Sequence, residues 1–240
     1  MILTNLRASA LALVIAASQG YAQSERYTGD GWSVLPPPGW EPLDEAYLKV
    51  MTATLQDITQ SENQRYIAGF ADPAIWPDGE YLLIQLHDNP FSGIRESELK
   101  EAFGALDASV AEMSDQVSRS TGGLVEDMSV GSIIYEADRR RVLMRFQSMV
   151  DGTPQETYSV LHPGKTKGIQ LNWYSPQAEF KDSLPVFVAS SDSFTWESGH
   201  EWTPRIKAGS RILLYAVSGA LAGGFATLVM GMIKKRKQPA

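Results

Sequence analysis

The chain has no cysteine among its 240 residues. It therefore forms no disulfide, although an exported domain is free to use one, and no cysteine is present to carry a lipid anchor. Histidine is nearly as scarce, with His87, His162 and His200 far apart in the chain. Because none of the three has metal-ligand spacing to another, the sequence predicts no metal site.

Recognisable catalytic motifs are also missing. The sequence contains no H-E-x-x-H, G-x-S-x-G or G-x-G-x-x-G pattern. Gly164-Lys165-Thr166 resembles the end of a P-loop, but Ser159 stands where that motif requires glycine. His87 and Asp88 are adjacent on an expected strand, so their side chains point to opposite faces. We therefore expect no catalytic residues and no cofactor.

Basic residues are sparse in the middle of the chain. Residues 23–203 hold all 28 acidic residues but only 13 basic ones, a net charge of −15, against −7 for the whole chain. So acidic a segment disfavours binding to nucleic acid or adsorption to anionic lipid. We expect no nucleic-acid partner.

What the sequence does contain is a long uncharged run near its end. The 22 residues 212–233 carry no charge and are followed by a basic block, Lys234 to Lys237. A helix of this length rises about 33 Å, enough to cross a hydrocarbon core of roughly 30 Å. The run predicts one C-terminal membrane helix, with the tail 234–240 in the cytoplasm.

The N-terminus has the features of a secretory signal. Arg7 precedes a short apolar stretch, and Gly20 and Ala22 suit cleavage after residue 22. The predicted organisation is a signal peptide over 1–22, an exported domain over 23–205, a linker over 206–211, and then the span. This indicates a single-pass protein of the bacterial inner membrane, with its domain in the periplasm.

Small residues form a ridge along the predicted span. Gly219, Gly223, Thr227 and Gly231 recur every four residues. Small residues allow close approach of membrane helices, so we expect this face to join a homo-oligomer or a membrane complex. The alternative is that the helix serves only as an anchor.

Residues 23–205 read as one mixed α+β domain. Helical spacing predicts helices over 43–60 and 97–117. A third is expected with Ser175 as its cap and Pro176 at its first position, and Pro185 should kink or end it. The stripe of the second helix comprises Leu99, Phe103, Leu106, Val110, Met113 and Val117.

Strands are expected over 32–35, 65–71, 80–87, 129–137, 140–150, 155–162 and 167–174. Because the last four are joined by short turns, they should be antiparallel neighbours. The predicted class is an antiparallel sheet with helices packed on it, an α/β/α sandwich.

A family resemblance rests on two short motifs. Ser33-Val34-Leu35-Pro36 with Pro38-Gly39-Trp40 resembles the opening of PsbP-like and DcrB-like (Mog-type) proteins. Ser193-Phe194-Thr195-Trp196 is similar to their closing strand, and the order of elements over roughly 27–197 also fits. The resemblance implies a non-enzymatic domain used in assembly or protein contact, with no catalytic residues to carry over. The C-terminal span departs from the family pattern.

One polar cluster is a candidate binding site. Arg141 and Arg145 share a strand face, Arg139 lies in the turn before them, and Glu156, Tyr158, Gln170 and Asn172 are expected on the same face. In so acidic a domain, Arg139, Arg141, Arg145 and Tyr158 suit an anionic ligand or an acidic partner. The alternative is ordinary cross-strand pairing on a solvated face.

Three functional hypotheses stay open. The first is a non-enzymatic envelope protein that binds a protein partner or assists assembly of a membrane complex. The second is an anchored periplasmic hydrolase built from scattered residues such as His87 and the Arg139–Arg145 cluster. The third is a small-ligand sensor or carrier subunit. A pocket of convergent, desolvated titratable groups would favour the enzyme.

Overall fold

The computed structural model of the chain describes residues 25–59, 62–88, 96–97, 114–115, 117–119, 123 and 125–203. The predicted signal peptide, linker, membrane span and basic tail lie outside these residues, as does most of the helix expected over 97–117. Within the described ranges, no helix is long and apolar enough to cross a bilayer.

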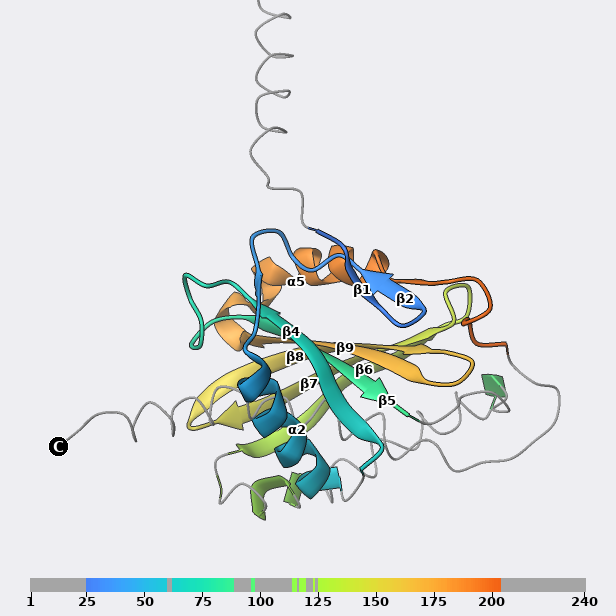
Figure 1. The fold of residues 1–240 in the computed structure, drawn as a ribbon. Coiled ribbons are helices and arrows are strands. Elements are labelled where there is room, and N and C mark those ends of the chain that lie inside the picture. Colours follow the sequence, from blue (N-terminus) through green and yellow to red (C-terminus); the bar gives the residue numbers. More distant parts are fainter. Residues whose placement is uncertain are drawn as a thin grey trace, which may run out of the picture.

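The central sheet is antiparallel and has seven strands in the described part of the chain (Figure 1). Strands β6 to β9 lie side by side in sequence order, which confirms the predicted meander. The hairpin of β4 and β5 joins this meander through pairing of β5 with β9. In spatial order the strands are β3 (Glu41–Pro42), β4 (Gln64–Ala71), β5 (Tyr81–His87), β9 (Gly168–Pro176), β8 (Thr153–Pro163), β7 (Arg141–Val150) and β6 (Val125–Glu136).

Helices pack on the two faces of this sheet, so the predicted α+β class is confirmed. Met51 and Leu55 of α2 (Glu45–Thr59) belong to the core on one face. Phe180 and Phe187 of α5 (Gln177–Asp192) belong to the core on the other. Side chains alternate between faces along each strand, so β8 supplies Leu161 to the α2 core and Val160 to the α5 core.

A second, small sheet closes the domain on the α5 side. It contains β1 (Tyr27–Gly29), β2 (Trp32–Val34) and β10 (Thr195–Trp196), in that order. The two motifs that resemble the PsbP-like family therefore meet: Leu35 N donates to Ser193 Oγ at 2.7 Å. Trp32 and Val34 are buried in the α5 core beneath. The pairing of β2 with β10 was not predicted.

Helix α2 also protects the edge of the sheet at β4. The short β3 pairs only with Phe70 and Ala71. Farther along β4, Thr52 Oγ1 accepts a hydrogen bond from Tyr66 N at 3.0 Å, and Gln56 Nε2 donates to Gln64 O at 3.1 Å. Side chains of the helix thus satisfy edge groups that would otherwise invite another strand.

The expectation for the start of α5 was wrong in its details. Pro176 is the N-cap residue and no side chain caps the helix. Ser175 is still within β9, and its hydroxyl donates to Glu80 Oε1 at 3.0 Å instead. Pro185 does not end the helix, which continues to Asp192. Phe180 and Phe187, buried on either side of Pro185, hold both halves against the sheet and offset the lost helical hydrogen bond.

Only Val117 of the predicted hydrophobic stripe lies among the described residues. It is helical and buried in the α2 core. Nearby, Ser114 Oγ accepts a hydrogen bond from Met128 N of β6 at 3.3 Å. The C-terminal end of this element therefore packs beside β6, as a helix on the sheet requires.

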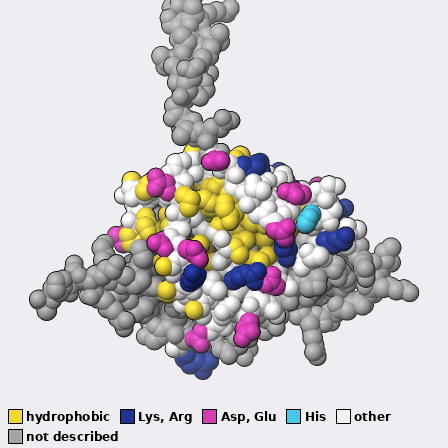
Figure 2. Space-filling model, viewed as in Figure 1, with side chains coloured by type: hydrophobic (Ala, Val, Ile, Leu, Met, Phe, Trp, Pro, Cys, Tyr) yellow, Lys and Arg dark blue, Asp and Glu magenta, His cyan; other side chains and the backbone are white. Residues whose placement is uncertain are grey.

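The surface of the domain mixes both signs of charge with one apolar area. Figure 2 shows hydrophobic side chains in the middle of the viewed face, with acidic and basic side chains around them. Partly buried Tyr27, Trp40 and Ile67 belong to the core on the α5 side.

Candidate functional site

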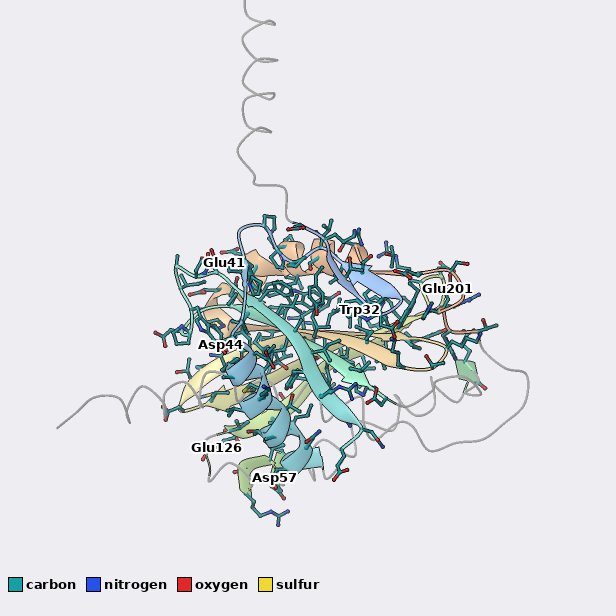
Figure 3. The ribbon with its side chains drawn as sticks, viewed as in Figure 1. Trp32, Glu41, Asp44, Asp57, Glu126 and Glu201 are labelled. Atoms are coloured by element: carbon teal, nitrogen blue, oxygen red, sulfur yellow. The ribbon has the colours of Figure 1, made fainter. Side chains whose placement is uncertain are left out.

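A cavity of about 520 Å³ lies at the end of the sheet where α5 ends. The turn between β6 and β7, the end of β8, the end of α5 and the segment after β10 all meet there. Figure 3 labels Glu201 at this end, apart from Asp57 on α2 and Asp44 just before that helix. The lining residues are Asp138, Arg139, Arg140, Arg141, His162, Pro163, Ser191, Asp192, Phe194, Trp196, Glu201 and Trp202.

A second cavity of about 430 Å³ borders the first along β7 and α5. The two share a wall made of Asp138, Arg139, Arg141 and Asp192. We call these four residues the ionic wall.

Arg141 is the buried centre of the ionic wall, with only 4% of its surface exposed. Its Nε donates to Glu136 Oε2 at 2.6 Å, and its Nη1 lies 2.8 Å from Asp192 Oδ1. Burial opposes the charge, but the hydrogen bonds that Arg141 donates to both carboxylates outweigh it and raise the pKa of Arg141 above its usual value. The guanidinium is therefore charged and held by two carboxylates.

Arg139 completes the ionic wall from the outside. It pairs with the same Asp192 and is about half exposed. Helix α5 carries no basic residue in its last turn, so Arg139 and Arg141 supply the positive charge that the negative end of the helix dipole favours.

The fold places Tyr158 and Arg145, the other two predicted binding residues, in different surroundings. Tyr158 is buried and lines the second cavity beside Arg139 and Arg141. Burial raises the pKa of its hydroxyl. Arg145 lines neither cavity: it pairs with Glu156 on β8, and its guanidinium lies over the Phe180 ring, 4.8 Å from the centroid. The structure thus brings three of the four together.

The composition of this sheet face differs from the expectation. Tyr158 lies opposite Trp173 in the pairing of β8 with β9, whereas Asn172 lies opposite Ser159. Gln170 and Asn172 therefore point to the α2 side, away from the arginines. The arginine face is not a freely solvated surface, because α5 packs on it and buries Arg141.

On the α2 side, polar side chains form a buried chain of hydrogen bonds. His87 Nε2 bonds Gln170 Oε1 at 2.9 Å, and Gln170 Nε2 donates to Ser159 Oγ at 2.9 Å. Burial lowers the pKa of His87 to about 4, although the bond to Gln170 works in the opposite direction. Asp88 pairs instead with Arg65. His87 and Asp88 are thus separate, as their strand positions predicted.

His162 lies on β8 and lines the first cavity. Its ring stacks on Phe194 with centroids 3.9 Å apart, and its buried Nε2 has no hydrogen-bond partner in the described part of the chain. Burial, together with the nearby Arg141 charge, holds the pKa of His162 well below its usual value. The imidazole is therefore neutral.

The cavity contains a serine, a histidine and an aspartate, but they do not form a catalytic relay. Ser191 Oγ accepts a hydrogen bond from Arg141 Nη1 at 3.1 Å, and Asp192 is engaged by two arginines. A general base needs its imidazolium stabilised by a carboxylate, whereas a cation faces His162. In the parts of the chain that the structure describes, no group of three acidic or histidine side chains is placed to hold a metal ion.

Sequence reasoning missed the contributions of the chain after β9. Ser191 and Asp192 reach Arg141 across about fifty residues of chain, so no local pattern joins them. Trp202 is buried in the α2 core, and its carbonyl oxygen accepts a hydrogen bond from Arg140 at 3.2 Å. The one signal of this site in the sequence was a cluster of arginines in an otherwise acidic domain.

The predicted helix–helix contact residues Gly219, Gly223, Thr227 and Gly231 lie outside the described part of the chain. Their role stays a prediction.

Comparisons with known proteins identify the fold. No protein-family model matches the chain, and no curated protein matches its sequence. The solution structure of cyanobacterial PsbP from Synechocystis sp. PCC 6803 superposes with a TM-score of 0.51 at 15% identity, covering 74% of this chain and 95% of that one.

Two further structures align less closely. The Ran-binding protein Mog1p of Saccharomyces cerevisiae has a TM-score of 0.38 at 10% identity, covering 72% of this chain and 96% of that one. LpqN, involved in cell envelope biogenesis of Mycobacterium tuberculosis, has a TM-score of 0.37 at 13% identity, covering 71% and 88%. The fold comparison rests on PsbP, and the resemblance to the PsbP-like family is confirmed at the level of the fold.

Proposed function

We propose that this protein is a non-enzymatic, single-pass envelope protein whose exported α+β domain binds a protein partner and assists assembly of a membrane complex. The PsbP-like fold is compatible with such a role. Anchoring in the bacterial inner membrane through residues 212–233, with the domain in the periplasm, is part of the proposal.

The observation that carries the proposal is the ionic wall. Its buried guanidinium is already bound by Glu136 and Asp192, and the one histidine beside it is neutral and faces a cation. Arg141 and His162 are therefore held in place, but neither is suited to donate or accept a proton near neutral pH. A rigid, charge-paired surface between two hollows suits recognition better than chemistry, which disfavours the hydrolase hypothesis.

The chain also leaves the domain at this end. Trp202 lines the first cavity and, among the residues that the structure describes, is the buried residue nearest to the predicted span. The nine residues 203–211 extend over at most about 30 Å. The cavity end of the domain would therefore stay near the bilayer, where a membrane complex would be met.

A site-specific crosslinking experiment tests the proposal. A photoreactive amino acid is placed at Asp138 on the rim of the ionic wall and, as a control, at exposed Lys49 on α2. Irradiation of native membranes should yield a discrete adduct from position 138 alone. Discrete adducts from neither position, or equally from both, would reject a partner at this end of the domain.

A further inference from the structure

The first cavity contains binding groups that the fold itself leaves unused. Its volume of about 520 Å³ lies inside the range of roughly 300–1,000 Å³ that is usual for small-ligand sites. His162 is only 6% exposed, yet its Nε2 has no hydrogen-bond partner among the residues that the structure describes. Buried polar atoms are normally satisfied, so an unpartnered nitrogen in a residue that lines the cavity favours a ligand there.

Arg140 is the second group of this kind. In contrast to Arg139 and Arg141, it has no carboxylate partner among the described residues, and its one hydrogen bond runs from Nη1 to Trp202 O. It occupies the turn between β6 and β7 with φ of 50°, a conformation unusual for a residue with a side chain. The remaining guanidinium donors are available at the cavity.

The charge balance limits the charge of the ligand. The lining includes three arginines and three carboxylates, Asp138, Asp192 and Glu201. The arginines and carboxylates of the lining are thus equal in number, and of the three arginines Arg140 alone lacks an acidic partner among the described residues. Because the negative end of the α5 dipole is also close, a dianion such as phosphate would be repelled more strongly than a single negative charge.

Flat apolar side chains form the rest of the lining. Phe194 stacks on His162, and Trp196 meets Phe194 edge-on with centroids 5.3 Å apart. Both are only partly buried. Aromatic rings of this kind pack well against another flat, apolar group.

We propose that this cavity binds a carboxylate carried on a flat apolar group, with Arg140 and the N–H of neutral His162 donating to the carboxylate and Phe194 and Trp196 packing on the ring. The ligand is either a free aromatic carboxylic acid or the C-terminal aromatic residue of a partner. The site goes beyond the proposed partner-binding function, and only the second source depends on it.

Calorimetric titration of the full chain in detergent tests the site. Phenylacetate and phenylacetamide have the same shape, but only the first carries the charge. The acid should bind at least about tenfold more tightly than the amide, because a charge-assisted hydrogen bond is lost with the amide. Equal affinity of the pair, or no binding of either, would overturn the proposal without recourse to a mutant.

Variants then locate the binding. Arg140→Gln should weaken phenylacetate binding about tenfold, whereas Arg65→Gln, at an ion pair on β4, should leave it unchanged. Thermal unfolding of both variants checks that they are folded. Unchanged affinity in Arg140→Gln would place the acid elsewhere and reject this cavity.

A short peptide that ends in phenylalanine separates the two sources. If this peptide, with its C-terminal carboxylate free, binds more tightly than phenylacetate, the ligand is a partner's C-terminus. If phenylacetate binds more tightly than the peptide, the ligand is a small molecule. Both results support the carboxylate site. Failure of the Asp138 crosslink with successful acid binding would remove the partner-binding function and keep the site.

Discussion

Arg139 and Arg141 share Asp192 but differ greatly in burial, and this difference decides what each contributes. About half of the Arg139 side chain is exposed, against 5% for Arg141. Exposed ion pairs contribute at most about 1 kcal/mol because water and salt screen them. A buried charge left without its partner costs several times more.

Arg141→Met should therefore lower the free energy of unfolding by about 3 kcal/mol, toward the low end for buried pairs because Glu136 and Asp192 are partly exposed. Arg139→Met, the matched control, should cost no more than about 1 kcal/mol. Urea unfolding followed by tryptophan fluorescence measures both. Similar costs for the two variants would contradict the assignment of Arg141 as the centre of the ionic wall.

The two buried histidines should make the domain sensitive to acid. The pKa of His87 falls to about 4 on folding, from an ordinary value of 6.5, so the unfolded chain binds a proton that the folded domain excludes. The stability that neutral His87 allows is intact above pH 6.5 and is lost as the pH falls toward 4. At pH 5 the loss in the free energy of unfolding should be about 2 kcal/mol. His162, whose pKa is also lowered, acts in the same direction.

His87→Gln should accordingly flatten the loss of stability between pH 6.5 and 4, measured by urea unfolding at a series of pH values. His200→Gln, at a histidine that is only partly buried, is the control and should retain the wild-type slope. An unchanged slope in His87→Gln would mean that His87 is already protonated in the folded domain.

At the scale of elements, the relation of α2 to the edge strand β4 gives a matched pair of variants. The hydroxyl of Thr52 accepts from Tyr66 N, whereas that of Thr54 only donates to Val50 O within the helix. Thr52→Val should cost about 1 kcal/mol of stability, and Thr54→Val close to nothing. Chemical denaturation compares them, and equal effects would show that the helix does not protect this edge.

The predicted membrane helix offers a second test at this scale. If Gly219, Gly223, Thr227 and Gly231 form a packing face, Gly223→Leu should disrupt association while leaving insertion intact, because leucine makes the span more apolar. Leu228→Ile, off that ridge, is the control. A two-hybrid assay for membrane helices reports the contact, and equal signals from wild type and both variants would reduce the helix to a tether.

The elements that were predictable from the sequence are those with local patterns. The meander of β6 to β9 follows from alternation and short turns, and α2 follows from the spacing of Tyr47, Met51 and Leu55. The pairing of β2 with β10 joins residues about 160 apart in the chain, which no local pattern encodes. The cavity is built in the same way, so Arg139 and Arg141 were predictable but Asp192 and His162 were not.

At the scale of the whole molecule, the position of Trp202 links the core to the predicted anchor. It is 1% exposed and belongs to the same core as Val142 and Leu161. The folded unit therefore extends past β10 to at least this residue. A movement of the predicted linker would therefore act on the buried Trp202 side chain and on the first cavity, which Trp202 lines.

Two truncations make this link measurable. A domain spanning 23–203 retains Trp202 and should be soluble, with one cooperative unfolding transition. A domain spanning 23–200 loses the indole and the carbonyl that accepts from Arg140, and it should be less stable by about 3–5 kcal/mol, the usual cost of removing a large buried aromatic group. Trp202→Ala in the longer domain separates the side chain from the backbone contact, since it removes the indole alone. Identical urea midpoints for 23–203 and 23–200 would place Trp202 outside the cooperative core, and the cavity end would then have no mechanical connection to the membrane segment through this residue.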